Sequence, residues 1–189
     1  MTSKRNDLLT AAKKLMWEHG YNAMSPRDLL KESGAGQGSL YHFFDGKLDL
    51  AVTAIEEISE EMQDFSAQLM PKSMSGFKRA EAYLSLARDG LKGCRLGRFA
   101  SEAAITEPRL RAPILRYFTN LEQHLAEALK DAQAEGEITN SVLPSKLATM
   151  LISVVQGGFL LSRVHQSQDE IGNATATALA LLRCTKNAK

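Results

Sequence analysis

The sequence predicts an all-α protein of about nine helices, in which a small N-terminal domain precedes a larger helical body. Apolar residues recur at helical spacing along nearly the whole chain. No segment alternates apolar and polar residues between turn signals, as a half-buried strand would. The 189 residues suffice for one small core and one larger core. We therefore expect two domains, residues 1–46 and residues 47–189.

The composition is that of a globular protein, and its net charge does not indicate a nucleic-acid partner. Apolar residues make up 44% of the chain, charged residues 24%, and the net charge is +1. These values exclude a disordered polyelectrolyte. Residues 1–50 carry seven Lys or Arg against six Asp or Glu. Any basic surface must therefore come from the arrangement of these residues.

Several features predict a cytoplasmic protein without membrane association. The N-terminus reaches charged residues before any long apolar run, unlike a signal peptide. No segment is expected to be uninterrupted enough to cross a bilayer. The two cysteines, Cys94 and Cys184, are too few and too far apart for a disulfide framework and suit a reducing compartment.

No metal or cofactor site is expected. The four histidines lie far apart and lack cysteine or carboxylate partners at metal-ligand spacing. Residues 34–38 have the glycine content of a dinucleotide-binding loop. No strand precedes this run and no βαβ unit follows it, so that interpretation fails its own structural condition.

Three helices of falling length are predicted in the N-terminal domain. The first ends at Gly20, a residue typical of helix C-termini. Ser25 caps the second helix, Pro26 occupies its first position, and Asp28 completes a capping box. A glycine-rich break separates it from a third, short helix over residues 37–44. The apolar side chains of this helix are expected to be core residues that hold it against its neighbours: Leu40, Phe43 and Phe44. This order is typical of a helix-turn-helix, whose last helix inserts into the major groove of DNA.

In the body, a connector helix is predicted over residues 47–69. Prolines and glycines divide the rest of the chain into further helices. These are expected over about 77–91, about 96–105, from Pro108 to about Gly136, over about 144–166 and over about 169–184. The last two carry more apolar residues than one small body easily covers.

Polar side chains of the third helix suit contact with DNA. The Gln37 amide can pair with an adenine edge, and Ser39 can bond a base or a phosphate. Tyr41 and His42 project polar atoms from the same helix. Lys47, at the start of the connector, adds a charged contact to a phosphate. A solvated polar face is the alternative, and only the surrounding pattern favours DNA.

The segment from Gly38 to Leu50, GSLYHFFDGKLDL, closely resembles the recognition-helix signature of the TetR family of regulators. Preceding residues also fall where that family places its first two helices: Leu9, Ala12, Leu15, Gly20, Tyr21, Ser25, Leu29, Leu30, Ser33 and Gly34. The resemblance implies DNA contacts from Arg27, Gln37, Gly38, Ser39, Tyr41, His42 and Lys47. Gly36 and Met24 depart from the family's common Ser and Thr, which bears on cap geometry and operator preference.

The resemblance also implies how such a protein works. It would bind double-stranded operator DNA as a homodimer paired through its last two long helices. A small-molecule effector bound in the body would release the repressor from its operator. Neither a cofactor nor an enzymatic activity is implied.

Two other functions remain open at this point. The first is an all-α enzyme or thiol-based sensor that acts on small electrophiles through Cys94, although no general base is placed near it in the sequence. The second is a helical module that binds protein rather than DNA, which predicts no salt-dependent DNA affinity.

Residues 93–102, GCRLGRFASE, resemble a second segment, found in a subgroup of these regulators with a GCxxGxxAxE-like motif. That subgroup includes repressors that respond to reactive electrophiles or drug-like aromatics. Arg95 and Arg98 would favour a thiolate at Cys94. The candidate ligand-sensing residues are Cys94, Phe99, Tyr117 and Phe118, and each has an ordinary alternative as a core residue.

Overall fold

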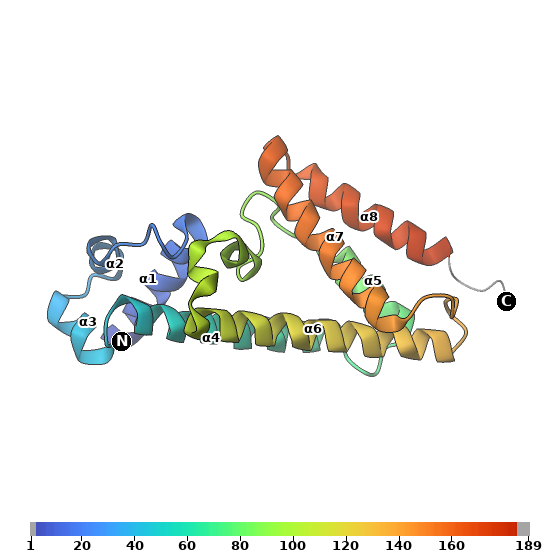
Figure 1. Ribbon diagram of the computed structural model, residues 1–189, viewed down its shortest axis with the longest axis horizontal. Helices are drawn as coiled ribbons and strands as arrows, with labels where there is room; N and C mark the ends of the chain where they lie inside the picture. The colour runs from blue at the N-terminus through green and yellow to red at the C-terminus, as the bar shows by residue number, and fades with distance from the viewer. Residues whose placement is uncertain (1–2, 185–189) are drawn as a thin grey trace. The chain divides into compact units, whose positions relative to one another are not determined.

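The computed structural model describes residues 3–184, and within that range every regular element is a helix (Figure 1). The α-helices are α1 (Lys4–His19), α2 (Pro26–Ser33), α3 (Gln37–Phe43), α4 (Lys47–Leu69), α5 (Gly76–Ser85), α6 (Pro108–Ala134), α7 (Pro144–His165) and α8 (Asp169–Cys184). Two 3-10 segments, η1 (Gly97–Ser101) and η2 (Ala103–Thr106), precede α6. The all-α prediction is confirmed, with eight α-helices among the described residues in place of about nine.

The chain divides into two compact units. The first comprises Met1–Met62 and Arg95–Tyr117, and the second comprises Gln63–Cys94 and Phe118–Lys189. Helices α4 and α6 each contribute residues to both units. The segment 95–117 thus lies in the same compact unit as α1, α2 and α3. The domain boundary expected after residue 46 stays a prediction.

Local sequence signals determine the first two helices as expected. Gly20 ends α1 with a φ of 87°, a conformation that favours glycine. The Ser25 hydroxyl oxygen accepts from the backbone N–H of Asp28 at 3.1 Å, and Pro26 begins α2. The side chains buried beneath α1 and α2 include Leu8, Leu9, Met16, Met24 and Leu29.

Helix α5 is shorter than its sequence pattern predicts, because it ends at Ser85 rather than near residue 91. The Arg88 guanidinium donates to the backbone carbonyls of Tyr83 (2.5 Å) and Leu86 (2.9 Å). These bonds satisfy carbonyls that would otherwise need a further helical turn. Gly90 then packs so closely on α7 that a Cβ there would collide with a side chain of that helix.

The helix predicted over about 96–105 is also wrong, because this stretch forms η1 and η2. Its turns are closed by hydrogen bonds between residues three apart in sequence, such as the one from the Phe99 N–H to the Leu96 carbonyl. The side chains of Arg98 and Glu102 bind the backbone near the end of α1. These tertiary contacts outweigh the local preference for a regular α-helix.

In the second unit, α5 packs directly against α6. The Gly76 backbone lies so close to the backbone of Ala128 and Ala132 that no Cβ fits there. The Glu137 carboxylate, just beyond α6, accepts from the backbone N–H of Phe77 at 2.9 Å. An acidic group at a helix N-terminus is stabilising, so Glu137 fixes the start of α5 on α6.

We expect Gly76→Ala to destabilise the protein by about 2–3 kcal/mol, because the added methyl group must push α5 away from the α6 backbone. The matched control is Gly172→Ala in α8, where a Cβ would meet nothing within 4 Å. That change removes glycine from a helix interior and should stabilise by about 0.5–1 kcal/mol. Thermal unfolding at one protein concentration measures both, and equal effects of the two variants would contradict the α5–α6 packing.

Helix α7 is apolar along much of its length and only partly buried. Contrary to the sequence-based expectation, Pro144–His165 is long and apolar enough, by length and composition alone, to cross a membrane. A Cβ at Gly158 would lie 3.0 Å from the Ile171 backbone, so this glycine allows α7 and α8 to pack closely. Gly157 faces open space, and Leu160 and Val164 are exposed.

Candidate nucleic-acid interface

The turn between α2 and α3 is built from small residues. Gly34 ends α2 in the left-handed conformation with a φ of 60°. The Ser33 hydroxyl accepts from the Ala35 N–H at 3.2 Å and tightens the turn. Gly36 occupies the N-cap position of α3 without a side-chain hydrogen bond. The first amides of α3 are therefore left without a side-chain cap, as expected from glycine at a position where the family commonly has Ser.

Helix α3 is anchored to α1 through few side chains. Leu40 is buried, and so is Phe44, which follows the helix in an extended conformation. The Arg5 guanidinium of α1 lies 5.5 Å from the centre of the Phe44 ring. The core roles predicted for Leu40 and Phe44 are confirmed, and the opposite face of α3 is left accessible.

The accessible face of α3 carries the side chains predicted to contact DNA. Gln37, Gly38, Tyr41 and His42 are exposed, and Ser39 is half-buried. The exposed fraction of Tyr41 is 60%, which is high for so large a side chain. Arg27 is exposed near the start of α2. The structure thus gathers five of the seven predicted contacts on α3.

Phe43 was predicted to be a core residue, and this is wrong, because its side chain is 38% exposed. The helix ends at Phe43 and the chain turns to extended backbone at Phe44, whose side chain is buried while that of Phe43 is not. The Phe43 ring stacks edge-on against His42, with ring centres 4.7 Å apart. Phe43 therefore adds an apolar group to the exposed face, suited to contact with a thymine methyl.

Lys47 begins α4 and is only half-buried. Its ammonium group donates to the Asn22 carbonyl at 3.4 Å and lies 4.4 Å from the centre of the Tyr21 ring. Burial lowers the pKa of Lys47, and the negative charge of Glu102 partly offsets this shift. The charge predicted to contact a phosphate is therefore held against the loop that follows α1.

The four candidate ligand-sensing residues are divided between the two compact units. Phe99 and Tyr117 are buried and belong to the first unit, whereas Cys94 and Phe118 belong to the second. The arginines expected to favour a Cys94 thiolate bind elsewhere: Arg95 pairs with Glu61 at 2.9 Å, and Arg98 donates to a backbone carbonyl of α1.

The two thiols differ in access, since Cys94 is buried and Cys184 is exposed. We expect a thiol reagent such as DTNB to label Cys184 at least about tenfold faster than Cys94 in the native protein. Cys184→Ser should remove the fast phase, and Cys94→Ser should leave it unchanged. A fast phase that survives Cys184→Ser would contradict the buried position of Cys94.

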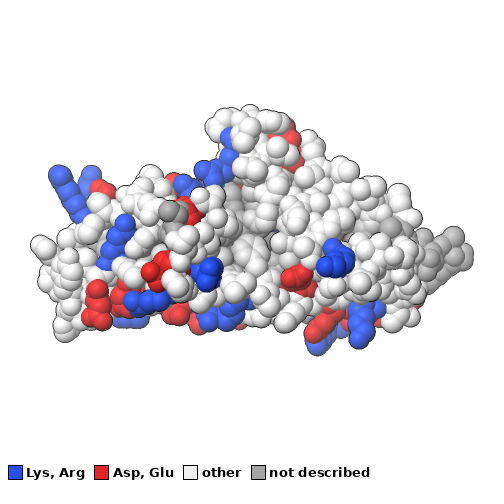
Figure 2. Space-filling view, in the orientation of Figure 1, with Lys and Arg blue, Asp and Glu red and all other residues white. Residues whose placement is uncertain are grey.

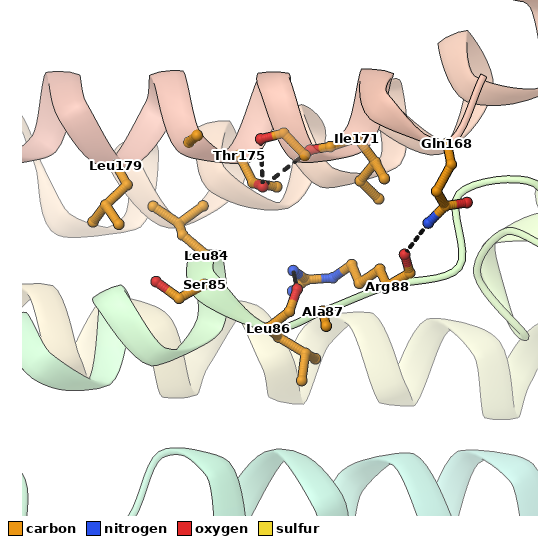
Figure 3. A pocket seen from close by; sticks show the side chains of 11 residues that line it. Leu84, Ser85, Leu86, Ala87, Arg88, Gln168, Ile171, Thr175 and Leu179 are labelled. Carbon is orange, nitrogen blue, oxygen red and sulfur yellow. Dashed lines mark hydrogen bonds between the residues drawn. The ribbon is translucent and has the colours of Figure 1, made fainter.

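A cavity of about 370 Å³ lies in the second unit, between the end of α5 and α8 (Figure 3). Leu84 from α5 and Ile171 and Leu179 from α8 form apolar walls. At one end, the Gln168 amide donates to the Arg88 carbonyl at 2.5 Å. This size, with apolar walls and a few polar groups, suits a small organic molecule.

A second hollow of about 530 Å³ lies on the outer side of α7 and α8. Its walls include Val154 and Leu161 from α7 and Leu181 from α8, and the last is 63% exposed. The surface over these two helices carries few charged side chains in the space-filling view (Figure 2). The lining is mainly apolar, with one carboxylate from Glu170, and exposed apolar patches are typical of protein–protein contacts.

Comparisons with known proteins agree with this geometry. Residues 8–54 match the family model described as bacterial regulatory proteins, tetR family, and residues 77–178, more than half of the chain, match the tetracyclin repressor-like C-terminal domain. A relative from Bacillus subtilis, the uncharacterized HTH-type transcriptional regulator YxaF, is 29% identical over 178 residues, covering 89% of this chain and 91% of its own.

Solved structures share the fold along nearly the whole length. Reduced NemR from Escherichia coli superposes with a TM-score of 0.85 at 21% identity, covering 98% of this chain and all of its own. A TetR-family regulator from Agrobacterium tumefaciens gives 0.86 at 23% identity, covering 95% of this chain and 97% of its own.

Proposed function

The chain belongs to the TetR family of bacterial regulatory proteins, and we propose that it is a homodimeric repressor that a small molecule releases from operator DNA. The chain is a helix-turn-helix transcriptional regulator rather than an enzyme. One observation carries the proposal. A short helix entered through a glycine turn presents an accessible polar face, while its other side is anchored by Leu40 and the adjoining Phe44.

The proposed DNA contacts divide by chemistry. Gln37 and His42 present groups that can bond base edges, and Tyr41 can reach a base or a phosphate. Arg27 and Lys47 lie near the starts of α2 and α4 and would hold phosphates on either side. Gly38 lets the α3 backbone approach the DNA without a Cβ collision, and its neighbour Ser39 adds a hydroxyl.

We propose that two protomers pair through α7 and α8. The mainly apolar hollow between these helices and the exposed apolar side chains around it support this interface. Gly157 faces open space in the single chain, so it leaves room for a close approach by a partner helix. The dimer would also account for the apolar character of α7 without a membrane, and we infer a cytoplasmic location.

The proposed effector has two candidate sites, and the first is the cavity between α5 and α8 in the second unit. The ligand would bind more tightly to a dimer whose recognition helices have a different spacing. It can lower operator affinity only by the ratio of its affinities for the two forms of the dimer. The resemblance of residues 93–102 to a subgroup of electrophile-responsive regulators supports a second arrangement, with Cys94, Phe99, Tyr117 and Phe118 as sensing residues. Because Cys94 is buried, its thiol is poorly accessible to an electrophile, so this second arrangement has less support than the cavity between α5 and α8.

Fluorescence anisotropy on labelled DNA from upstream of the protein's own gene tests the DNA-binding function. We expect tight binding whose affinity falls with salt, with a slope of about −0.9 for each phosphate contacted. A shuffled DNA of the same length and composition is the control. Equal affinity for both DNAs, or affinity that salt leaves unchanged, would contradict a regulator acting at that site.

A further inference from the structure

Residues 95–102 lie in the chain between two parts of the second unit but pack within the first unit, where the DNA-binding helices lie. We propose that Arg98 and Glu102 are positioning residues that hold the end of α1 and the start of α4, and so set the orientation of α3 on DNA. This inference rests on the proposed function and goes beyond it, because it assigns operator geometry to side chains outside the helix-turn-helix. We call these two side chains the latch.

The Arg98 guanidinium donates to the backbone carbonyl of Trp17 at 2.6 Å. Trp17 lies in the last turn of α1, where carbonyls lack partners within the helix and cations are favoured. Arg95, three residues earlier, binds Glu61 of α4, which also accepts from Lys13 of α1. The segment that carries the latch is therefore fastened to both helices.

The Glu102 carboxylate lies against the loop that follows α1. Its Oε2 accepts from the backbone N–H of Asn22 at 3.3 Å. A Cβ at Gly20 would lie 2.6 Å from Oε1 of the same carboxylate, so only glycine allows this approach. Gly20 also has a φ of 87°, which favours glycine. Both the backbone conformation and the approach of Glu102 therefore favour glycine at this position.

The same peptide segment is held from its other side by α4. The Asn22 carbonyl accepts from Lys47 at 3.4 Å, while the Asn22 N–H donates to Glu102. Lys47 and Glu102 carry opposite charges, and the charge of Glu102 raises the pKa of the lysine against the effect of burial. One backbone residue therefore joins the latch to the first residue of α4.

The latch contacts control the elements that hold α3. The loop of residues 20–25 connects α1 to α2, and Met24 within it is buried. Helix α2 leads through the glycine turn directly into α3. The Oε1 atom of Glu102 is buried without a hydrogen-bond partner, an arrangement that stability alone does not favour. The latch therefore acts on α3 through this loop and α2.

The test uses the full chain and an operator that the wild-type protein selects from random DNA. Operators with the central spacer lengthened or shortened by one base pair are compared with it. We expect Glu102→Ala and Arg98→Ala to reduce the preference for the selected spacing by at least about fivefold, with helicity and dimer unchanged. Glu102→Gln keeps the shape and one acceptor oxygen, so it should give a smaller loss.

The control variants remove the same charges from exposed positions of the same unit: Glu60→Gln on α4 and Arg111→Gln on α6. Both should retain the spacing preference of the wild type. If Arg98 and Glu102 only stabilised the fold, their loss would lower the affinity for operators of every spacing by the same factor. An unchanged ratio in the latch variants would therefore overturn the proposal, and Glu102→Gln decides it if Glu102→Ala does not fold.

A second measurement reads the latch without DNA. Hydrogen exchange of the Asn22 amide should be at least about tenfold faster in Glu102→Ala than in the wild type, because its acceptor is gone. Unchanged exchange would overturn the latch even if the protein binds DNA. Failure of the wild type to bind any DNA would instead overturn the proposed function, and the two failures are thereby distinguished.

Discussion

Replacing both Gln37 and Tyr41 with alanine is expected to lower operator affinity by at least about 100-fold, because each base contact contributes about 1–3 kcal/mol. Both side chains are exposed on α3, so their loss should leave the fold intact. The affinity is measured by fluorescence anisotropy on the selected operator at fixed salt. Circular dichroism and sedimentation establish that the variant remains a folded dimer.

A matched control separates base contact from general loss of surface polarity. Gln68→Ala and Gln123→Ala change exposed side chains on α4 and α6, in the second unit. Together they should leave operator affinity unchanged. If the α3 variant bound the operator as tightly as this control, α3 would not be the recognition helix.

The second large effect is expected at the proposed dimer surface. Leu161→Glu combined with Leu181→Glu places two carboxylates in the apolar hollow of α7 and α8. Burying unpaired charges costs several kcal/mol, so the variant should sediment as a folded monomer. Operator affinity should fall at least about 100-fold, because a monomer contacts one half-site only.

Leu115→Glu provides the control for this surface. Leu115 on α6 is 61% exposed, much like Leu181, but lies in the first unit. This variant should remain a dimer at the concentrations that dissociate the double variant. A double variant that stays dimeric would place the interface elsewhere, and a monomeric Leu115→Glu would do the same.

The N-terminal helices could be predicted because their ends are determined locally. A cap at Ser25, a proline at the first helical position and a glycine stop each act within a few residues. The exposed face of α3 could be predicted from the same local pattern, because Leu40 lies on the buried side of the helix and the polar residues lie on the other side. The resemblance of the segment to known regulators then supplied its function.

The parts that could not be predicted depend on contacts between residues distant in sequence. Helix α5 ends at Ser85, and the chain beyond it is bound to Gln168, whose side chain contacts the Arg88 carbonyl and the Gly90 N–H. Residues 96–105 depart from an α-helix, with side chains bound to α1 and the loop that follows it. The GCRLGRFASE motif was noticed, but its contacts with α1 and Asn22 required the fold.

Selection from random double-stranded DNA by the full-length protein tests the central claim most directly. We expect enrichment of a pseudo-palindrome whose half-sites lie about one helical turn apart, roughly 35 Å, as two recognition helices of a dimer require. The Gln37→Ala and Tyr41→Ala double variant should not enrich it. A folded dimer that enriches no sequence, or a motif without two-fold symmetry, would contradict the account.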